Sequence, residues 1–339
     1  MNKVKMYLIY GIIGLLCVAA LTGYLIDRSR NGGTAEVIAA TDTNTPNPAQ
    51  NPDEPVVGIA QGDDYAATTR KAVENAGGLG GIITKGDTVL IKPNICGYSK
   101  FGSPLITDYR VVEEVIKIAR ECGAEKIIIG EGPISGMAFN NDVNGYKNIQ
   151  DVEFVEFNSL SEEDCYEVKA ENSLTGNSFF IPKVYMDADV VIGVPKLKTH
   201  FQPDAVISLC LKNMYGVPPG KIYGVGYKNG LHQMGLKESI VDLNMIRKPD
   251  FQVVDGIIGG EGYGPLDNKP VDSQIILAGT DPVAVDTVGL TFMGFTADEI
   301  PHVKLAAESG VGIADLSKIK VVGAVLDDIK MKFKPAFGN

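Results

Sequence analysis

The sequence predicts an α/β protein: a three-layer fold with a mostly parallel sheet, preceded by one N-terminal transmembrane helix. Two observations indicate this class, because short apolar segments alternate with amphipathic ones in βαβ order and several apolar segments end in polar residues. The 339 residues, 45% of them hydrophobic, provide enough apolar material for a full core. We divide the chain into an anchor over 1–30, a flexible linker over 31–54 and an α/β domain over 55–339.

The predicted anchor is an uncharged apolar run over 6–26 that lies between Lys5 and Asp27. This run is long enough to span a bilayer. A cleaved signal peptide is the alternative, because Val18 and Ala20 form an acceptable small-residue cleavage pattern. The apolar residues continue past that point, which favours the anchor. The basic residues at the start favour an N-terminus inside, so we expect a single-pass protein of the cell membrane with its body outside the cytoplasm.

The predicted linker, 31–54, is rich in Asn, Thr, Ala and Pro and has no hydrophobic period that could bury a face. Such a composition is typical of a flexible tether.

The elements of the domain follow in order. Strands are predicted where apolar runs lie between turn signals, at 56–60, 88–91, 126–129, 152–157, 178–181, 190–194, 252–254, 274–277 and 319–322. Helices are predicted from apolar residues at helical spacing and from cap signals, at 65–76, 109–122, 205–214, 231–245, 282–292 and 297–309. Asp281 before Pro282 is predicted to cap a helix. The Gly-, Tyr- and Lys-rich segment 215–230 is predicted to be a loop over the site.

The charge and the cysteines exclude several classes of function. The formal net charge of -11 argues against a nucleic-acid partner, which would require a basic surface. Five cysteines occur, with no C-x-x-C pair: Cys17, Cys96, Cys122, Cys165 and Cys210. This spacing argues against a zinc ribbon, and no iron-sulphur cluster is expected from the chain's own cysteines. Buried free thiols are the simplest interpretation, with a disulfide as the alternative.

The segment after the apolar strand 190–194 contains the main candidate site. In an extended segment, alternate side chains point to one face, so Lys196, Lys198 and His200 would point the same way just beyond the carboxyl end of a strand. Open parallel α/β sheets place their ligands there. We therefore assign these three as candidate catalytic residues, in which the lysines supply electrostatic stabilisation and His200 acts as acid or base.

Other polar residues near predicted strand or helix ends are candidate ligand-binding residues. They are Lys92, Asn94, Lys212, Asn213, His232, Asp255, Glu261 and Asp286. Asp286 is surrounded by apolar residues and therefore needs a partner, such as a lysine or a metal. His302 is expected to be exposed on a surface helix. The identity of any metal is left open, because no H-x-x-x-H or H-E-x-x-H spacing predicts a preformed site.

Several ordered motifs resemble domain-of-unknown-function family 362, from about residue 56 to 294. The resemblance rests on 89–94, 107–108, 187–189, 195–200, 212–216, 254–256, 261–265 and 278–286. It implies an α/β fold but hardly a reaction, and it implies that the candidate residues other than His232 belong to one site. Members of that family are sometimes joined to ferredoxin-like iron-sulphur modules, whose clustered cysteines this chain lacks.

The sequence thus predicts a membrane-anchored domain that binds a small anionic ligand or an unknown cofactor at a crevice lined by lysine, histidine and carboxylate side chains. It leaves open whether the protein is an enzyme. Two alternatives are a non-catalytic binding module tethered at the surface and a redox partner of an iron-sulphur protein.

Overall fold

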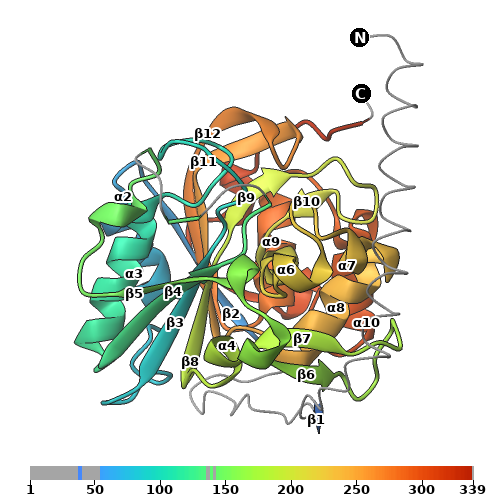
Figure 1. The fold of residues 1–339 in the computed structure, drawn as a ribbon. Helices are drawn as coiled ribbons and strands as arrows, with labels where there is room; N and C mark the ends of the chain where they lie inside the picture. Colours follow the sequence, from blue (N-terminus) through green and yellow to red (C-terminus); the bar gives the residue numbers. More distant parts are fainter. Residues whose placement is uncertain (1–36, 40–53, 135–137, 140–142, 338–339) are drawn as a thin grey trace.

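A large twisted sheet forms the centre of the domain (Figure 1). The computed structural model describes residues 37–39, 54–134, 138–139 and 143–337. Across the large sheet the strands follow the order β13 (Lys320–Gly323), β2 (Val56–Gln61), β12 (Asp267–Gly279), β11 (Phe251–Tyr263), β8 (Val190–Val194), β3 (Thr88–Pro93), β4 (Lys126–Glu131) and β5 (Glu153–Glu156). Two further strands lie off this path, β9 (Lys196–Thr199) and β10 (Ile207–Ser208).

Most neighbouring strands of the large sheet run parallel. The pairs β13/β2, β11/β8, β8/β3, β3/β4 and β4/β5 are all parallel, whereas β12 runs antiparallel to both of its neighbours. The prediction of an α/β fold with a mostly parallel sheet is confirmed. The carboxyl ends of β3, β4 and β8 therefore lie at the same edge of the sheet, as the site prediction requires.

Helices cover both faces of the sheet, and Figure 1 shows α2 and α3 on one side and α8, α9 and α10 on the other. The α-helices of the described residues are α2 (Tyr65–Asn75), α3 (Tyr109–Glu121), α4 (Lys183–Met186), α5 (Cys210–Asn213), α6 (Gly220–Tyr223), α7 (Asn229–Gln233), α8 (Leu236–Arg247), α9 (Pro282–Phe292), α10 (Pro301–Glu308) and α11 (Leu326–Ile329).

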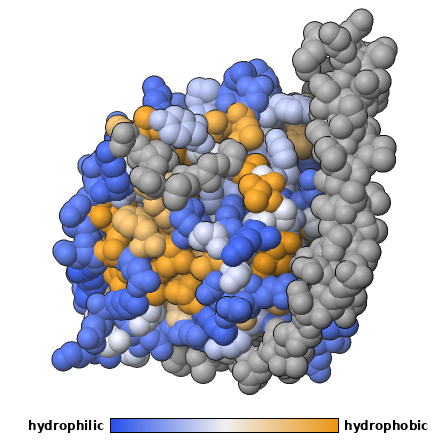
Figure 2. Space-filling model, viewed as in Figure 1, coloured by the Kyte–Doolittle hydropathy of each residue, from blue (hydrophilic) through white to orange (hydrophobic). Residues whose placement is uncertain are grey.

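The core has two parts because side chains alternate along each strand. In β3, Val89 and Ile91 pack with α2 and α3, whereas Leu90 packs in the other cluster, with α8 and α9. Both faces of the central strands are thus buried, which is why these strands are almost uninterrupted apolar runs. On the surface, hydrophilic residues line the edges of the face in Figure 2 and apolar residues gather in its middle.

Three predicted helices differ from the structure. The segment 205–214 contains the short strand β10 and then α5, because the amide of His200 donates to the carbonyl of Val206 and closes a β9/β10 pair. The helix predicted at 231–245 is two helices, α7 and α8, separated by Gly235 with φ 96°. The helix predicted at 297–309 is a 3-10 turn, Ala297–Glu299, followed by α10, which begins at Pro301.

Strands β11 and β12 are much longer than predicted and form an antiparallel hairpin of 13 residues in each strand. The prediction covered only their apolar parts, 252–254 and 274–277. The remaining residues are rich in glycine and polar side chains. They pair through backbone hydrogen bonds, which the hydropathy pattern of the sequence does not reveal.

The predicted flexible linker contains a strand. Residues Val37–Ala39 form β1, which pairs in parallel with β6 (Cys165–Lys169) in a small sheet that β7 (Phe179–Pro182) completes. These three residues lie inside the range 31–54 that the sequence predicts to be a linker. The rest of 31–53 and the predicted anchor lie outside the described residues. Within the described residues, no helix is both long enough and apolar enough to cross a membrane.

Candidate functional site

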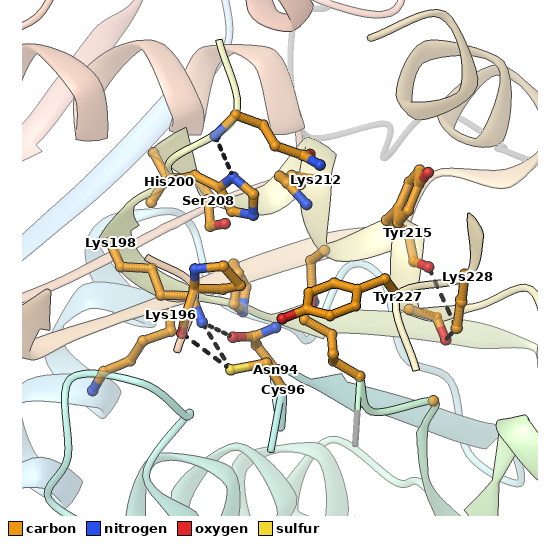
Figure 3. A pocket seen from close by; sticks show the side chains of 18 of the residues that line it. Asn94, Cys96, Lys196, Lys198, His200, Ser208, Lys212, Tyr215, Tyr227 and Lys228 are labelled. Carbon is orange, nitrogen blue, oxygen red and sulfur yellow. Dashed lines mark hydrogen bonds between the residues drawn. The ribbon is translucent and has the colours of Figure 1, made fainter. Parts of the chain in front are cut away.

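A pocket with about 710 Å³ of space, part of it open to solvent, lies at the carboxyl ends of β3, β4 and β8 (Figure 3). Of the predicted site residues, seven line it: Asn94, Lys196, Lys198, His200, Lys212, Asn213 and His232. The structure thus brings together residues from strand ends, from α5 and from α7.

The three predicted catalytic residues share one face of β9 and its extension, as the alternation of side chains requires. Between them, Leu197 is fully buried in the core, and the hydroxyl of Thr199 donates to the carbonyl of Gly262 at 2.8 Å. Lys196, Lys198 and His200 all line the pocket, although Nζ of Lys196 is directed to Asp255 behind it, and their neighbours hold the strand in place.

Lys196 forms an ion pair with Asp255, with 2.8 Å between Nζ and Oδ2, and both side chains are buried. Asp255 also accepts a hydrogen bond from the amide of Asp108 at 2.8 Å. Burial raises the pKa of Asp255, and Lys196 acts against that rise. Asp255 lies behind Lys196 and does not line the pocket, so it compensates a charge of the site.

A second buried ion pair joins Lys92 to Glu131. Lys92 also donates to the side-chain oxygen of Asn213 at 3.1 Å, and the amide group of Asn213 donates back to the carbonyl of Lys92. Burial lowers the pKa of Lys92, and Glu131 opposes that shift. Glu131 and Asn213 line the pocket, whereas Lys92 lies behind them.

Three other lysines in the pocket have no carboxylate partner among the described residues: Lys198, Lys212 and Lys228. We call them the open lysines. Lys198 donates to the carbonyl of Leu105 at 2.6 Å, to the side-chain oxygen of Asn94 at 2.8 Å and to the sulfur of Cys96 at 3.3 Å.

Among the described residues, the contacts of the other two open lysines are also with neutral groups. Nζ of Lys212 lies 5.1 Å from the ring centre of Tyr215. Nζ of Lys228 donates to the carbonyl of Gly216 at 2.9 Å. Burial is the main reason why the pKa of Lys198 is lowered, that of Lys212 falls to about 8 and that of Lys228 falls to about 7.

His200 is held in one tautomer. Its Nδ1 accepts a hydrogen bond from the amide of Gln202 at 3.1 Å, and its ring stacks on Phe201. Burial, and after it Lys212 and Lys198, lower its pKa, so the ring is neutral near pH 7. Because Nδ1 is an acceptor, the proton of the neutral ring lies on Nε2. This geometry favours His200 as a hydrogen-bond donor over a role as general base.

His232 has a different environment from His200. Its Nδ1 lies 3.1 Å from the hydroxyl of Tyr215 and 3.3 Å from the carbonyl of Lys228. Burial lowers the pKa of His232. Tyr215 and His232 thus form a neutral polar pair in the wall of the pocket.

Two predicted ligand-binding residues lie away from the pocket. Glu261 is on the β11/β12 hairpin, where it accepts from the amide of Lys334 at 2.9 Å. Asp286 is fully buried and accepts from the amides of Cys210 at 2.7 Å and Leu211 at 3.1 Å. The partners that the structure gives Asp286 are backbone amides at the start of α5 rather than a lysine. Asp286 thereby positions α5, which carries two pocket residues.

His302, which we expected to be exposed, is fully buried, and burial lowers its pKa to about 3. The four described cysteines are free, and Cys96 lines the pocket. Among the described residues, no three His, Cys, Asp or Glu side chains gather in a way that could hold a metal ion.

Sequence reasoning missed Lys228 and Tyr215 as pocket residues. Lys228 lies in the segment predicted to be a loop, and its backbone is left-handed with φ 51°. The only signal was a lysine among the glycines of 224–230, and nothing in the sequence indicates that its side chain turns inward. Figure 3 shows the ring of Tyr227, from the same segment, pointing across the pocket towards Asn94.

A family model described as Domain of unknown function (DUF362) matches residues 89–291. A thylakoid-associated protein of Synechocystis sp. is 31% identical over 252 residues, which are 73% of this chain and 75% of that protein. The chain belongs to the DUF362 family. Every predicted site residue, and Lys228 as well, lies inside the range that the DUF362 model matches.

Two solved structures are also similar to this DUF362 chain. One is the lactate racemase apoprotein from Thermoanaerobacterium thermosaccharolyticum, with a TM-score of 0.48, 14% identity and coverage of 74% of this chain and 59% of that one. The other is a Thermotoga maritima protein, with a TM-score of 0.39, 12% identity and coverage of 73% and 60%. The chain thus spans less than two thirds of each solved structure.

Proposed function

We propose that the pocket binds a small organic or inorganic anion that carries carboxylate or phosphate groups. The observation that carries this proposal is the group of open lysines, Lys198, Lys212 and Lys228, which face one pocket and have no carboxylate partner among the described residues. Buried ammonium groups are costly when unpaired. An anion would compensate them and raise their pKa values towards the ordinary range.

Two buried ion pairs, each with one member in the wall of the pocket, support this proposal. Lys196 is compensated by Asp255 and Lys92 by Glu131, so these lysines hold the strand ends and leave the open lysines for the ligand. Nε2 of His200 and the side chain of Asn94 add neutral polar groups to the same pocket. Lys198 and His200 would then bind and polarise an anion, whereas Lys196 would position β9.

We propose that Lys212→Gln weakens anion binding without unfolding the protein. Nζ of Lys212 contacts the ring of Tyr215, so its removal leaves no buried carboxylate unpaired. A hydrogen bond to a charged group contributes about 1.5–3 kcal/mol, and we expect sulfate or citrate affinity to fall roughly 10- to 100-fold. Isothermal titration calorimetry on the full chain measures this loss.

The matched control is Lys221→Gln, because Lys221 is an exposed lysine of α6 in the same part of the chain. The sulfate or citrate affinity of Lys221→Gln should equal that of the wild type. Absence of binding by the wild-type chain, or equal affinity for the wild type and Lys212→Gln, would contradict the proposal.

We also propose that the apolar run 6–26 holds the domain at a membrane, with its body outside the cytoplasm. The length of that run supports this proposal. A relative that is described as thylakoid-associated adds support. We expect a reporter enzyme fused after Asn339 to be active only outside the cytoplasm and to sediment with membranes after alkaline carbonate treatment. A reporter that is active only in the cytoplasm would contradict the proposed orientation. Release of the protein by carbonate would contradict the membrane anchor.

A further inference from the structure

Lys228 differs from the other lysines of the pocket in how it is placed. It is 4% exposed, and it follows Gly224 and Gly226, whose φ angles of 103° and 91° allow the chain to turn sharply before it. Its Nζ contacts backbone carbonyls, that of Gly216 at 2.9 Å and that of Tyr215 at 3.4 Å. A neutral amine has two N–H groups and can donate to both carbonyls, although more weakly than an ammonium group, so these contacts do not require a charged side chain.

The glycines opposite Lys228 leave room for its amine. A Cβ atom at Gly132 would lie 2.9 Å from Nζ of Lys228 and 2.5 Å from the carbonyl oxygen of Gly216. Both Gly132 and Lys228 line the pocket, so the space that glycine leaves open adjoins the cavity. The amine is therefore buried and still borders the space in which a ligand would bind.

The charges around Lys228 favour its neutral form. Burial has the largest effect and lowers its pKa, Glu131 raises it, and Lys92 and Lys212 lower it further, to about 7. The other titratable groups that face it are Tyr215 and His232, which hydrogen-bond to each other, and His232 also contacts the carbonyl of Lys228. An amine that is desolvated beside another cation is the known form of an activated lysine nucleophile.

We propose that Nζ of Lys228 forms a Schiff base with an anionic carbonyl compound, either a 2-oxo acid or a phosphorylated aldehyde or ketone. This inference rests on the proposed function, because Lys198 and Lys212 would bind the anionic group of the same molecule. The neutral amine attacks the carbonyl carbon and forms a C–N bond. The carbonyl oxygen then leaves as water with both protons of the amine, which gives the imine.

Reductive trapping on the full chain tests this assignment. The chain is incubated with cyanoborohydride and pyruvate, glyoxylate, dihydroxyacetone phosphate or uncharged acetone, and the modified lysine is located by peptide mass spectrometry. We expect a secondary amine on Lys228 with at least one anionic probe and none with acetone. The carboxylate and phosphate probes then distinguish the two substrate classes.

The rate of trapping provides a second measurement. The pKa of Lys228 is lowered to about 7, so far more of it is neutral at pH 7 than of a lysine of ordinary pKa. We therefore expect Lys228 to be trapped faster than exposed Lys221, with a pH midpoint well below that of an ordinary lysine. A midpoint near 10 would overturn the inference.

Two variants separate this inference from the proposed function. Lys228→Arg removes the primary amine that would form the imine, so it should lose the adduct. Lys221→Arg, at an exposed position outside the pocket, should change neither sulfate binding nor the adduct. Sulfate binding without any adduct on Lys228, or an adduct on Lys212 or Lys198 instead, would overturn only the Schiff base. Loss of both sulfate binding and adduct in the wild-type chain would overturn the proposed function as well.

Discussion

Two groups of lysines lie in and directly behind the pocket, and they differ in their partners. Lys92 and Lys196 are buried and paired with Glu131 and Asp255. The open lysines, Lys198, Lys212 and Lys228, face the same pocket and contact only neutral groups among the described residues. The paired lysines therefore belong to the folded structure, and the open lysines are available to a ligand.

The position of a lysine at a strand end therefore does not by itself decide whether the lysine has a structural or a ligand-binding role. Lys196 and Lys198 lie on the same face of β9, two residues apart. What separates them is the residue opposite each one, because Asp255 compensates Lys196 whereas Lys198 donates to a carbonyl, an amide oxygen and a thiol. Stability should depend on the paired lysines and ligand binding on the open ones.

The largest expected effect comes from breaking one of the ion pairs. Asp255→Ala would leave the ammonium group of Lys196 buried without a counter-charge, and it would remove an acceptor of the Asp108 amide. Breaking a buried pair on one side costs about 3–5 kcal/mol of stability. The chain contains no tryptophan, so guanidinium unfolding of the full chain is followed by circular dichroism.

The control is the double variant Lys196→Met/Asp255→Leu, which removes both charges and should recover most of the lost stability. Lys212→Gln removes a buried ammonium group that has no carboxylate partner among the described residues, so it should not lower the free energy of unfolding. If Asp255→Ala and Lys212→Gln destabilised the protein equally, the distinction between paired and open lysines would be wrong.

The next effect is an opposite response of binding and stability to pH. The open lysines bind anions when protonated, and the pKa values of Lys228 and Lys212 are about 7 and about 8. Sulfate does not change its own charge between pH 6 and 9. We therefore expect its affinity to be greatest below pH 7 and to fall at least about tenfold by pH 9, as titration calorimetry measures.

The stability of the unliganded protein should change in the other direction. Both lysines have lowered pKa values in the folded state, so between pH 7 and 10 the unfolded chain binds more protons and stability rises with pH. Titratable groups around Lys212 include Lys198, Cys96 and His200. The rise is measured as the difference between wild type and Lys212→Gln, and a stability difference that falls with pH would contradict the assigned shift.

The apolar parts of the fold could be predicted because strands that are buried on both faces are uninterrupted apolar runs in the sequence. Strands β3 and β8 lie where their apolar runs predict them, and α9 begins at the predicted cap, Asp281, and covers the predicted range. The hairpin ends of β11 and β12 could not be predicted, because glycine and polar residues pair there through the backbone. The split between α7 and α8 depends on the positive φ of Gly235, which hydropathy does not reveal.

The site was predictable to the extent that it lies on one strand. Alternation along β9 places Lys196, Lys198 and His200 on a common face, and no distant contact is needed to infer it. The roles of Asp255 and Asp286 depend on contacts 59 and 76 residues apart in the sequence, with Lys196 and Cys210. The side chain of Lys228 turns inward because its backbone is left-handed, with φ 51°. A single sequence does not directly indicate this backbone conformation.

The smallest expected effect is at Glu261, which extends the comparison to a carboxylate outside the pocket. Glu261 accepts from the amide of Lys334, and its carboxylate lies 3.6 Å from Nζ of the exposed Lys334 side chain. Glu261→Gln keeps an acceptor for that amide, so we expect sulfate affinity within twofold of wild type and a stability change within about 0.5 kcal/mol. A tenfold loss of sulfate affinity would instead show that the β11/β12 hairpin contributes to anion binding. The division between structural carboxylates and open lysines would then not account for all residues that affect binding.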